Sequence, residues 1–210
     1  MNRNYQTEQE NFWAGSFGDE YIARNIGDEY LASNLHFFSD VFRVVQKPES
    51  IIEFGANVGM NLKAIRLLLP KTKLFGVEIN EKAASELAEV IGKDHVFNET
   101  IFDFNAEEKY DVSLIKGVLI HINPEKLPLV YEKLYRSSKK YIVIAEYYNP
   151  TPVTINYRGH ENRLFKRDFC SEIRAQYPDL TLIDYGFCYR NDPEFPQDDI
   201  TWFLLEKHEL

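Results

Sequence analysis

Cysteine is scarce in this chain. Only Cys170 and Cys188 occur in 210 residues, and their number and spacing fit neither a disulfide framework nor a zinc site. We therefore expect free thiols in a reducing compartment and no metal centre. Long apolar runs are lacking too: residues 141–145, among the longest, match a strand and are far too short to cross a bilayer. The first residues are polar, unlike a signal peptide. These absences predict a cytoplasmic protein without a membrane partner.

Basic residues are also in short supply. The chain has 24 Lys and Arg against 33 Asp and Glu, a formal net charge of −9, and no local cluster of Lys or Arg offsets this imbalance. A polyanion would be repelled on average, so nucleic acid is not an expected partner. Hydrophobic residues make up 44% of the chain, which is enough for the core of one α/β domain of this length.

From residue 51 onward, short apolar runs alternate with segments of helical periodicity. The apolar runs predict strands over residues 51–54, 73–77, 95–98, 110–115 and 141–146. The intervening segments predict helices over residues 59–69, 81–91 and 124–137. Regular alternation of strand and helix favours a parallel, doubly wound sheet.

The C-terminal part has a different pattern. A helix is predicted over residues 166–176, followed by strands over 180–189 and 201–206, which a turn-rich link over 190–199 connects. Two strands joined without a helix should pair antiparallel. We therefore predict a Rossmann-like α/β fold with a mostly parallel seven-stranded sheet and a C-terminal antiparallel hairpin. That ending is typical of class I methyltransferases and unlike a dinucleotide dehydrogenase domain.

The N-terminal residues form a separate region in this interpretation. Helical spacing over residues 8–25, interrupted by glycines, and over 28–45 predicts a helical cap or lid over residues 1–47. Residues 48–210 then form the main domain of a single globular unit. We expect Tyr21 and Arg24 to face a bound cofactor, with Arg24 a candidate for contact with a carboxylate. A helix that only packs against the domain is the alternative.

The segment after the first strand carries the most specific signal. Gly55 would let the chain turn sharply, and Gly59 would let the next helix begin close to a ligand. A nicotinamide dinucleotide fingerprint would require glycine where Asn57 and Met60 stand. Glu53, two residues before Gly55, instead fits the motif that binds S-adenosylmethionine (SAM). This pattern predicts SAM as cofactor. The alternatives are a turn with a purely structural role and a dinucleotide-dependent sugar enzyme.

Further residues fit the same cofactor. Glu78 follows the second strand, where its two carboxylate oxygens can accept both ribose hydroxyl hydrogens; a charge that only stabilises a helix N-terminus is the alternative. Ile79 and Ile101 are expected to make apolar contacts with the adenine. The polar partner of its exocyclic amine is Thr100, Asp103 or a backbone group, and the sequence does not decide between them. The remaining residues assigned to the cofactor are Asn57, Met60, Asn61, Lys116 and Gly117.

Ligands of open α/β sheets bind beyond the carboxyl ends of the strands. This rule places an acceptor near His121 after the fourth strand, near Tyr147 after the fifth, and near the long segment over residues 149–164. Long loops in compact domains are usually functional. Tyr157, Arg158 and Arg163 within it are predicted to bind the acceptor, the arginines through two-pronged contacts with an anionic group. Solvent-exposed loop charges are the alternative.

Methyl transfer to a hydroxyl or a protonated nitrogen requires a base. His121 is the first candidate, because the reference pKa of histidine, about 6.5, suits neutral pH. A histidine that caps or packs before Pro124 is the competing interpretation. Glu146 and His160 are the other candidates for this catalytic role.

Several segments resemble one family. They are FWAGSFGDEY at 12–21, KGVLIHI at 116–122, EYYNPTP at 146–152, NYRGH at 156–160 and PQDDITWF at 196–203. Together they resemble the pseudaminic acid biosynthesis-associated methylases along nearly the whole chain. The resemblance implies a bacterial SAM-dependent methyltransferase that acts on a small molecule, a nonulosonic (sialic-acid-like) sugar or its nucleotide-activated form, in surface or flagellar glycan biosynthesis. A non-catalytic SAM- or sugar-binding accessory protein is the alternative.

Overall fold

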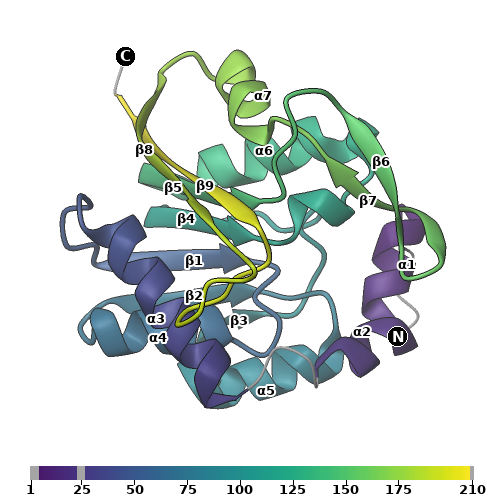
Figure 1. The fold of residues 1–210 in the computed structure, drawn as a ribbon. Coiled ribbons are helices and arrows are strands. Elements are labelled where there is room, and N and C mark those ends of the chain that lie inside the picture. The colour runs from purple at the N-terminus through teal and green to yellow at the C-terminus, as the bar shows by residue number, and fades with distance from the viewer. Residues whose placement is uncertain (1–4, 23–26, 209–210) are drawn as a thin grey trace.

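A computed structural model describes residues 5–22 and 27–208, and Figure 1 shows their arrangement. The α-helices are α1 (Glu8–Ala14), α2 (Ser16–Tyr21), α3 (Asp28–Phe42), α4 (Met60–Leu68), α5 (Glu81–Ile91), α6 (Leu127–Ser137) and α7 (Phe169–Gln176). The strands are β1 (Ser50–Phe54), β2 (Lys73–Val77), β3 (Val96–Phe97), β4 (Tyr110–Lys116), β5 (Ser138–Glu146), β6 (Val153–Tyr157), β7 (His160–Lys166), β8 (Leu180–Cys188) and β9 (Ile200–Lys207). Short 3-10 turns are η2 (Lys93–His95), η3 (Leu119–His121) and η4 (Pro124–Lys126).

Seven strands form the main sheet in the order β3-β2-β1-β4-β5-β9-β8. Strands β1 to β5 pair in parallel, whereas β9 pairs antiparallel with both β5 and β8. The predicted sheet with its C-terminal antiparallel hairpin is therefore confirmed. The chain builds outward from β1 to β3 and then crosses back to β4, so β1 and β4 flank the point where the strand order reverses. Ligands of such sheets bind at this point.

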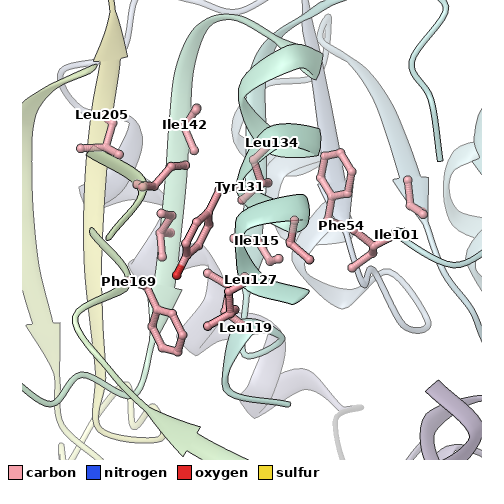
Figure 2. Packing of buried hydrophobic residues seen from close by; sticks show 14 of the residues in the cluster. Phe54, Ile101, Ile115, Leu119, Leu127, Tyr131, Leu134, Ile142, Phe169 and Leu205 are labelled. Atoms are coloured by element: carbon pink, nitrogen blue, oxygen red, sulfur yellow. The ribbon is translucent and has the colours of Figure 1, made fainter. Parts of the chain in front are cut away.

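Both faces of the sheet are buried, because alternate residues of each strand point to opposite layers. On one face, Ile51 of β1 packs in a cluster with Phe37 and Phe38 of α3. On the other face, β1 contributes Ile52 and Phe54 to a second cluster beneath α6 and α7. Figure 2 shows residues of that second cluster, among them Phe54, Ile115 and Ile142 of the sheet and Leu127, Tyr131 and Leu134 of α6. The two layers hold the carboxyl ends of the strands in fixed positions.

The predicted cap over residues 1–47 divides into two parts in space. Helix α3 packs on the sheet beside α4, and its Phe38 and Val41 are fully buried there. Helices α1 and α2 lie apart from it, next to β6 and β7 (Figure 1). The break between them falls at Gly15, which ends α1 and begins α2. Helices α1 and α2 thus lie over the carboxyl ends of the strands, whereas α3 is mainly a part of the packed layer on the sheet.

The prediction of one long loop over residues 149–164 is wrong in part. Residues 153–157 and 160–166 form a two-stranded antiparallel sheet of their own. Arg158 and Gly159 make its two-residue turn with φ of 52° and 84°, the pair of positive values that a tight type I′ hairpin requires. The alternation of Val153, Ile155 and Tyr157 is the strand signal that indicates this hairpin.

Other boundaries differ by a few residues. The seventh α-helix begins at Phe169, not at 166, because Asp168 caps it by accepting from the Ser171 N–H at 2.9 Å. The third strand is shorter than predicted, Val96–Phe97. The segment expected to be helical over residues 124–137 is a 3-10 turn followed by α6. Within the described residues, no helix has the length and apolarity needed to span a membrane.

Candidate active site

A cavity of about 470 Å³ opens at the carboxyl ends of β1, β2 and β4, within the range of about 300–1,000 Å³ typical of small-molecule sites. Predicted site residues that line it are Tyr21, Gly55, Asn57, Met60, Asn61, Glu78, Ile79, Thr100, Ile101, Lys116, Gly117, His121, Tyr147 and Tyr157. Residues of α1, α2 and the link over 190–199 complete its walls. The structure therefore brings together residues that are far apart in the sequence.

The loop between β1 and α4 is a tight turn against the end of β2. The N–H groups of Gly55 and Ala56 both donate to the Val77 carbonyl, at 2.8 and 3.1 Å. Gly55 has φ +74°, and a side-chain carbon there would lie 2.5 Å from Cγ2 of Val118. Glycine is therefore required at this position on two counts, backbone conformation and space. The bare backbone of Gly55 borders the cavity.

Gly59 is required for a different reason from the one expected. A side-chain carbon at Gly59 would lie 2.6 Å from Cδ1 of Leu87 in α5, and its φ is +81°. Its missing side chain thus makes room for helix packing. Gly59 does not line the cavity, whereas Met60 beside it does.

Glu78 joins the β1–α4 loop to the end of β2. It is 8% exposed, and its two carboxylate oxygens accept from the backbone N–H groups of Asn57 and Asn80, each at 2.8 Å. Burial raises the pKa of Glu78, while these backbone donors lower it. Each oxygen has a second lone pair, so the carboxylate can still accept hydroxyl hydrogens from a ligand in the cavity.

Glu53 lies beneath the cavity and does not line it. Its side chain is fully buried, and Oε1 accepts from Asn61 Nδ2 at 2.6 Å. Burial raises the Glu53 pKa to about 8, against the opposing effects of Asn61 and Lys116. Glu53 therefore orients Asn61, which does line the cavity.

The region predicted for adenine has a polar partner that the sequence did not indicate. Glu10 of α1 is buried and accepts a hydrogen bond from the Thr100 hydroxyl. It also accepts from the Thr7 N–H at 2.9 Å in a capping box that begins α1. Asp103, one of the three open candidates, is exposed and accepts from Gln6 at 3.2 Å. Glu10 therefore fixes α1 over this end of the cavity.

His121 is buried at the opposite wall. Its Nδ1 lies 2.6 Å from the Arg163 carbonyl oxygen, which can only accept, so Nδ1 carries the proton and Nε2 keeps a free lone pair. Burial lowers the His121 pKa to about 4. The ring is therefore neutral at physiological pH, so Nε2 is free of a proton, but burial also makes the ring a weaker base than a free imidazole.

Aromatic side chains surround His121. The Trp13 ring lies 4.6 Å from it and the Tyr157 ring 5.0 Å, centroid to centroid. Tyr21 packs edge-on against Trp13 at 5.1 Å, and all four residues line the cavity together with Tyr147. The indole N–H of Trp13 has no partner among residues 5–22 and 27–208. This end of the cavity thus offers flat apolar faces and a spare donor.

The other two catalytic candidates lie outside the cavity wall. Glu146 is 2% exposed, and its Oε1 accepts from the Val118 and Leu119 N–H groups at 2.9 and 2.8 Å. Burial raises its pKa to about 7. His160 is exposed on β7 and packs against Phe12, with ring centroids 5.0 Å apart. Glu146 is thus placed to hold the turn that carries His121, and His160 to support the cap.

The two hairpin arginines assigned to the acceptor, Arg158 and Arg163, do not line the cavity. Arg163 extends to Glu8 of α1, with Nη2 3.2 Å from Oε2, and its guanidinium lies over the Phe12 ring. Arg158 is exposed at the hairpin tip, over the ring of Tyr157. Arg24 falls outside the described residues.

Several residues of the 190–199 link were missed as site residues. Arg190, Gln197 and Asp198 line the cavity, and the Tyr147 hydroxyl forms a hydrogen bond with Asp198. The available signal was the strand pairing: β8 and β9 lie beside β5, so the link between them ends near the carboxyl end of β5.

No protein-family model matches the chain, and neither does any curated protein. Solved structures match it in fold. The 1,6-didemethyltoxoflavin-N1-methyltransferase of Burkholderia thailandensis, with bound substrate and S-adenosylhomocysteine, superposes with a TM-score of 0.72 and 12% identity over 100% of this chain and 94% of that chain. The magnesium protoporphyrin IX methyltransferase of Synechocystis, with bound S-adenosylhomocysteine, superposes with a TM-score of 0.69 and 13% identity over 95% of this chain and 97% of that chain.

A third structure, the plantazolicin methyltransferase with a substrate analogue and S-adenosylhomocysteine, gives a TM-score of 0.63 and 15% identity over 95% of each chain. All three neighbours are methyltransferases solved with bound S-adenosylhomocysteine. The likeness establishes that this chain has the Rossmann-like fold of class I SAM-dependent methyltransferases.

Proposed function

We propose that this protein is a SAM-dependent methyltransferase that acts on a small molecule. The observation that carries the proposal is the cavity where the strand order reverses, with the Glu78 carboxylate at one end and the neutral His121 imidazole at the other. A cofactor bound between them would present its methyl group to an acceptor beside His121. The fold, shared with SAM-binding methyltransferases, supports the same conclusion.

The residues of the cavity fit SAM. Glu78 is placed to accept from the ribose hydroxyls, and Ile79 and Ile101 offer apolar contact to the adenine. Bare backbone at Gly55 permits close approach. Oδ1 of Asn61 is buried without a partner among the described residues, so it can accept from the ammonium group of the cofactor.

SAM supplies a methyl carbon that its sulfonium already activates. The protein's part is alignment of the acceptor and removal of its proton. The lone pair on His121 Nε2 is the group available for that proton, because Nδ1 is held by the Arg163 carbonyl. Trp13, Tyr21 and Tyr157 can close over the acceptor and exclude water. An oxygen or a nitrogen acceptor fits this arrangement equally.

For the acceptor we propose a nonulosonic (pseudaminic-type) sugar or its nucleotide-activated form in bacterial glycan biosynthesis. Support comes from the resemblance of residues 146–152, 156–160 and 196–203 to the pseudaminic acid-associated methylases. Aromatic faces at Trp13 and Tyr157, with polar groups at Asp198, also suit a hydroxylated ring. Arg158 at the hairpin tip remains the proposed contact for the sugar's anionic group.

Incubation with methyl-labelled SAM and a panel of sugars tests this proposal. The panel contains free nonulosonic acids, their nucleotide-activated forms and neutral hexoses as controls. We expect label only in nonulosonic acids or their activated forms. Label in another small molecule would refute the sugar assignment, and a protein that binds S-adenosylhomocysteine but labels nothing in a cell extract would be an accessory protein.

A further inference from the structure

Lys116 is a buried cation at the edge of the cavity. It is the last residue of β4, is 9% exposed and lines the cavity. Its Nζ lies 3.5 Å from Oδ1 of Asn34 and above the rings of Tyr30 and Phe37, at 5.7 and 5.4 Å. Within residues 5–22 and 27–208 it forms no ion pair within 4.0 Å. An ammonium has three donors, and buried lysines are normally paired.

Two buried acids lie near Lys116, yet each is engaged elsewhere. Glu53 accepts from Asn61, and Glu146 accepts from the Val118 and Leu119 N–H groups. The charge of Lys116 lowers the pKa of both acids, but burial outweighs it and leaves them at about 8 and about 7. Near neutral pH these acids therefore neutralise Lys116 only in part, and the ammonium retains affinity for an anion in the cavity.

Asn34 and Gln197 fix the ammonium in place. Oδ1 of Asn34 accepts from Lys116 and also from Nε2 of Gln197, the latter at 3.1 Å. Asn34 is fully buried in α3, and its Nδ2 has no partner among the described residues. Gln197, in the 190–199 link, is 7% exposed and lines the cavity. Three separate elements thus converge on one cation.

The strand order indicates which anion this cation meets. Glu78 follows β2, on one side of β1, and Lys116 ends β4, on the other side. A cofactor with its ribose at Glu78 and its chain along Gly55 therefore directs its amino-acid end toward Lys116. We propose that Lys116 binds the carboxylate of that end and that Asn34 and Gln197 are positioning residues for it. This inference rests on the proposed function and gives to Lys116 the contact that the sequence suggested for Arg24.

Calorimetry with two ligands tests this inference. One is S-adenosylhomocysteine, and the other is its decarboxylated analogue, which keeps the ammonium group but lacks the carboxylate. We expect the wild-type protein to prefer the first by about 10- to 100-fold, the usual effect of a charge-assisted hydrogen bond. Methionine is similar in length to lysine and has no charge. Lys116→Met should therefore abolish the preference, because it weakens the binding of S-adenosylhomocysteine and leaves the binding of the decarboxylated analogue unchanged. Lys126→Met removes a lysine outside the cavity wall and is the matched control.

Asn34→Asp provides the second variant. It keeps Oδ1 for Gln197, so a purely structural role would be preserved, but its carboxylate would compete for the Lys116 ammonium and should also reduce the preference. A Lys116→Met variant that still prefers S-adenosylhomocysteine as strongly as the wild type would overturn the inference. If Lys116→Met does not fold, the same undiminished preference in Asn34→Asp would overturn it. A wild-type protein that binds neither ligand would instead refute the proposed function.

Discussion

Nδ1 of His121 lies 2.6 Å from the carbonyl oxygen of Arg163, so the hairpin of β6 and β7 determines which imidazole nitrogen carries the proton. The carbonyl holds the proton on Nδ1, and the aromatic surroundings keep the ring neutral. The tautomer of this histidine is thus set by a contact between residues 42 positions apart in sequence. The proposed catalytic role of His121, and the other parts of the proposed site, lead to the following predictions.

Replacement of His121 by Asn should reduce kcat by about 10²- to 10⁴-fold, the usual contribution of a general base. The amide can still donate to the Arg163 carbonyl but cannot accept a proton. S-adenosylhomocysteine affinity, measured by calorimetry, should be unchanged. His95→Asn is the control, because His95 Nδ1 also meets a carbonyl oxygen, that of Ile91 at 3.1 Å, and His95 does not line the cavity. A His121→Asn enzyme with normal kcat would exclude the base.

Gly55→Ala should destabilise the fold by about 1–3 kcal/mol, since alanine is strained at positive φ and its Cβ meets the Val118 side chain. Binding of S-adenosylhomocysteine should weaken as well. Adding Val118→Ala relieves the contact but not the backbone strain, so the double variant should recover part of the stability. Urea unfolding measures each step, and a Gly55→Ala protein as stable as the wild type would contradict the geometry.

Glu53 should make the ligand-free protein less stable as pH rises. Its folded-state pKa is raised from 4.5 to about 8, so the folded state binds the extra proton between these values and its stability decreases as pH increases through that window. Glu53→Gln should therefore gain stability relative to wild type between pH 5 and 8, by on the order of a few kcal/mol. The pKa of His121 is lowered to about 4, which has the opposite effect on the pH dependence of stability. That effect is the same in the wild type and in Glu53→Gln, so it cancels from the difference between them. Parallel pH profiles from urea unfolding would contradict this assignment.

The two hairpin arginines should differ in effect. Arg163 contacts Glu8 and Phe12 of α1, so Arg163→Ala should make residues 5–22 easier to cleave by limited proteolysis. Arg158→Lys keeps the charge but loses the planar fork, and should raise the acceptor's KM without changing affinity for S-adenosylhomocysteine. A change in that affinity in Arg158→Lys would place the hairpin over the cofactor instead.

The fold and part of the site follow from local patterns. Strand–helix alternation and the Glu53-to-Gly55 spacing depend on residues close in sequence, so they predict the sheet and the loop at its edge. The β6–β7 hairpin was missed because its turn, Arg158-Gly159, stands among polar residues typical of loops.

Glu10 could not be predicted, since it reaches the cavity only through the packing of α1. Gln197 and Asp198 were missed, because the signal for them is the pairing of β9 with β5 and not a motif of their own. The reason for Gly59 could not be predicted either, because glycine is required there by Leu87 of the next helix and not by a ligand. Contacts of this kind depend on tertiary packing, which no local spacing encodes.

Calorimetry with S-adenosylhomocysteine and with NAD tests the central claim most directly. We expect S-adenosylhomocysteine to bind and NAD not to bind, because Asn57 and Met60 replace the glycines that a dinucleotide requires. Glu78→Ala should weaken the S-adenosylhomocysteine complex by about 1–3 kcal/mol per hydrogen bond lost to the ribose. A wild-type protein that binds NAD in preference, or a folded Glu78→Ala variant with unchanged affinity, would contradict the account.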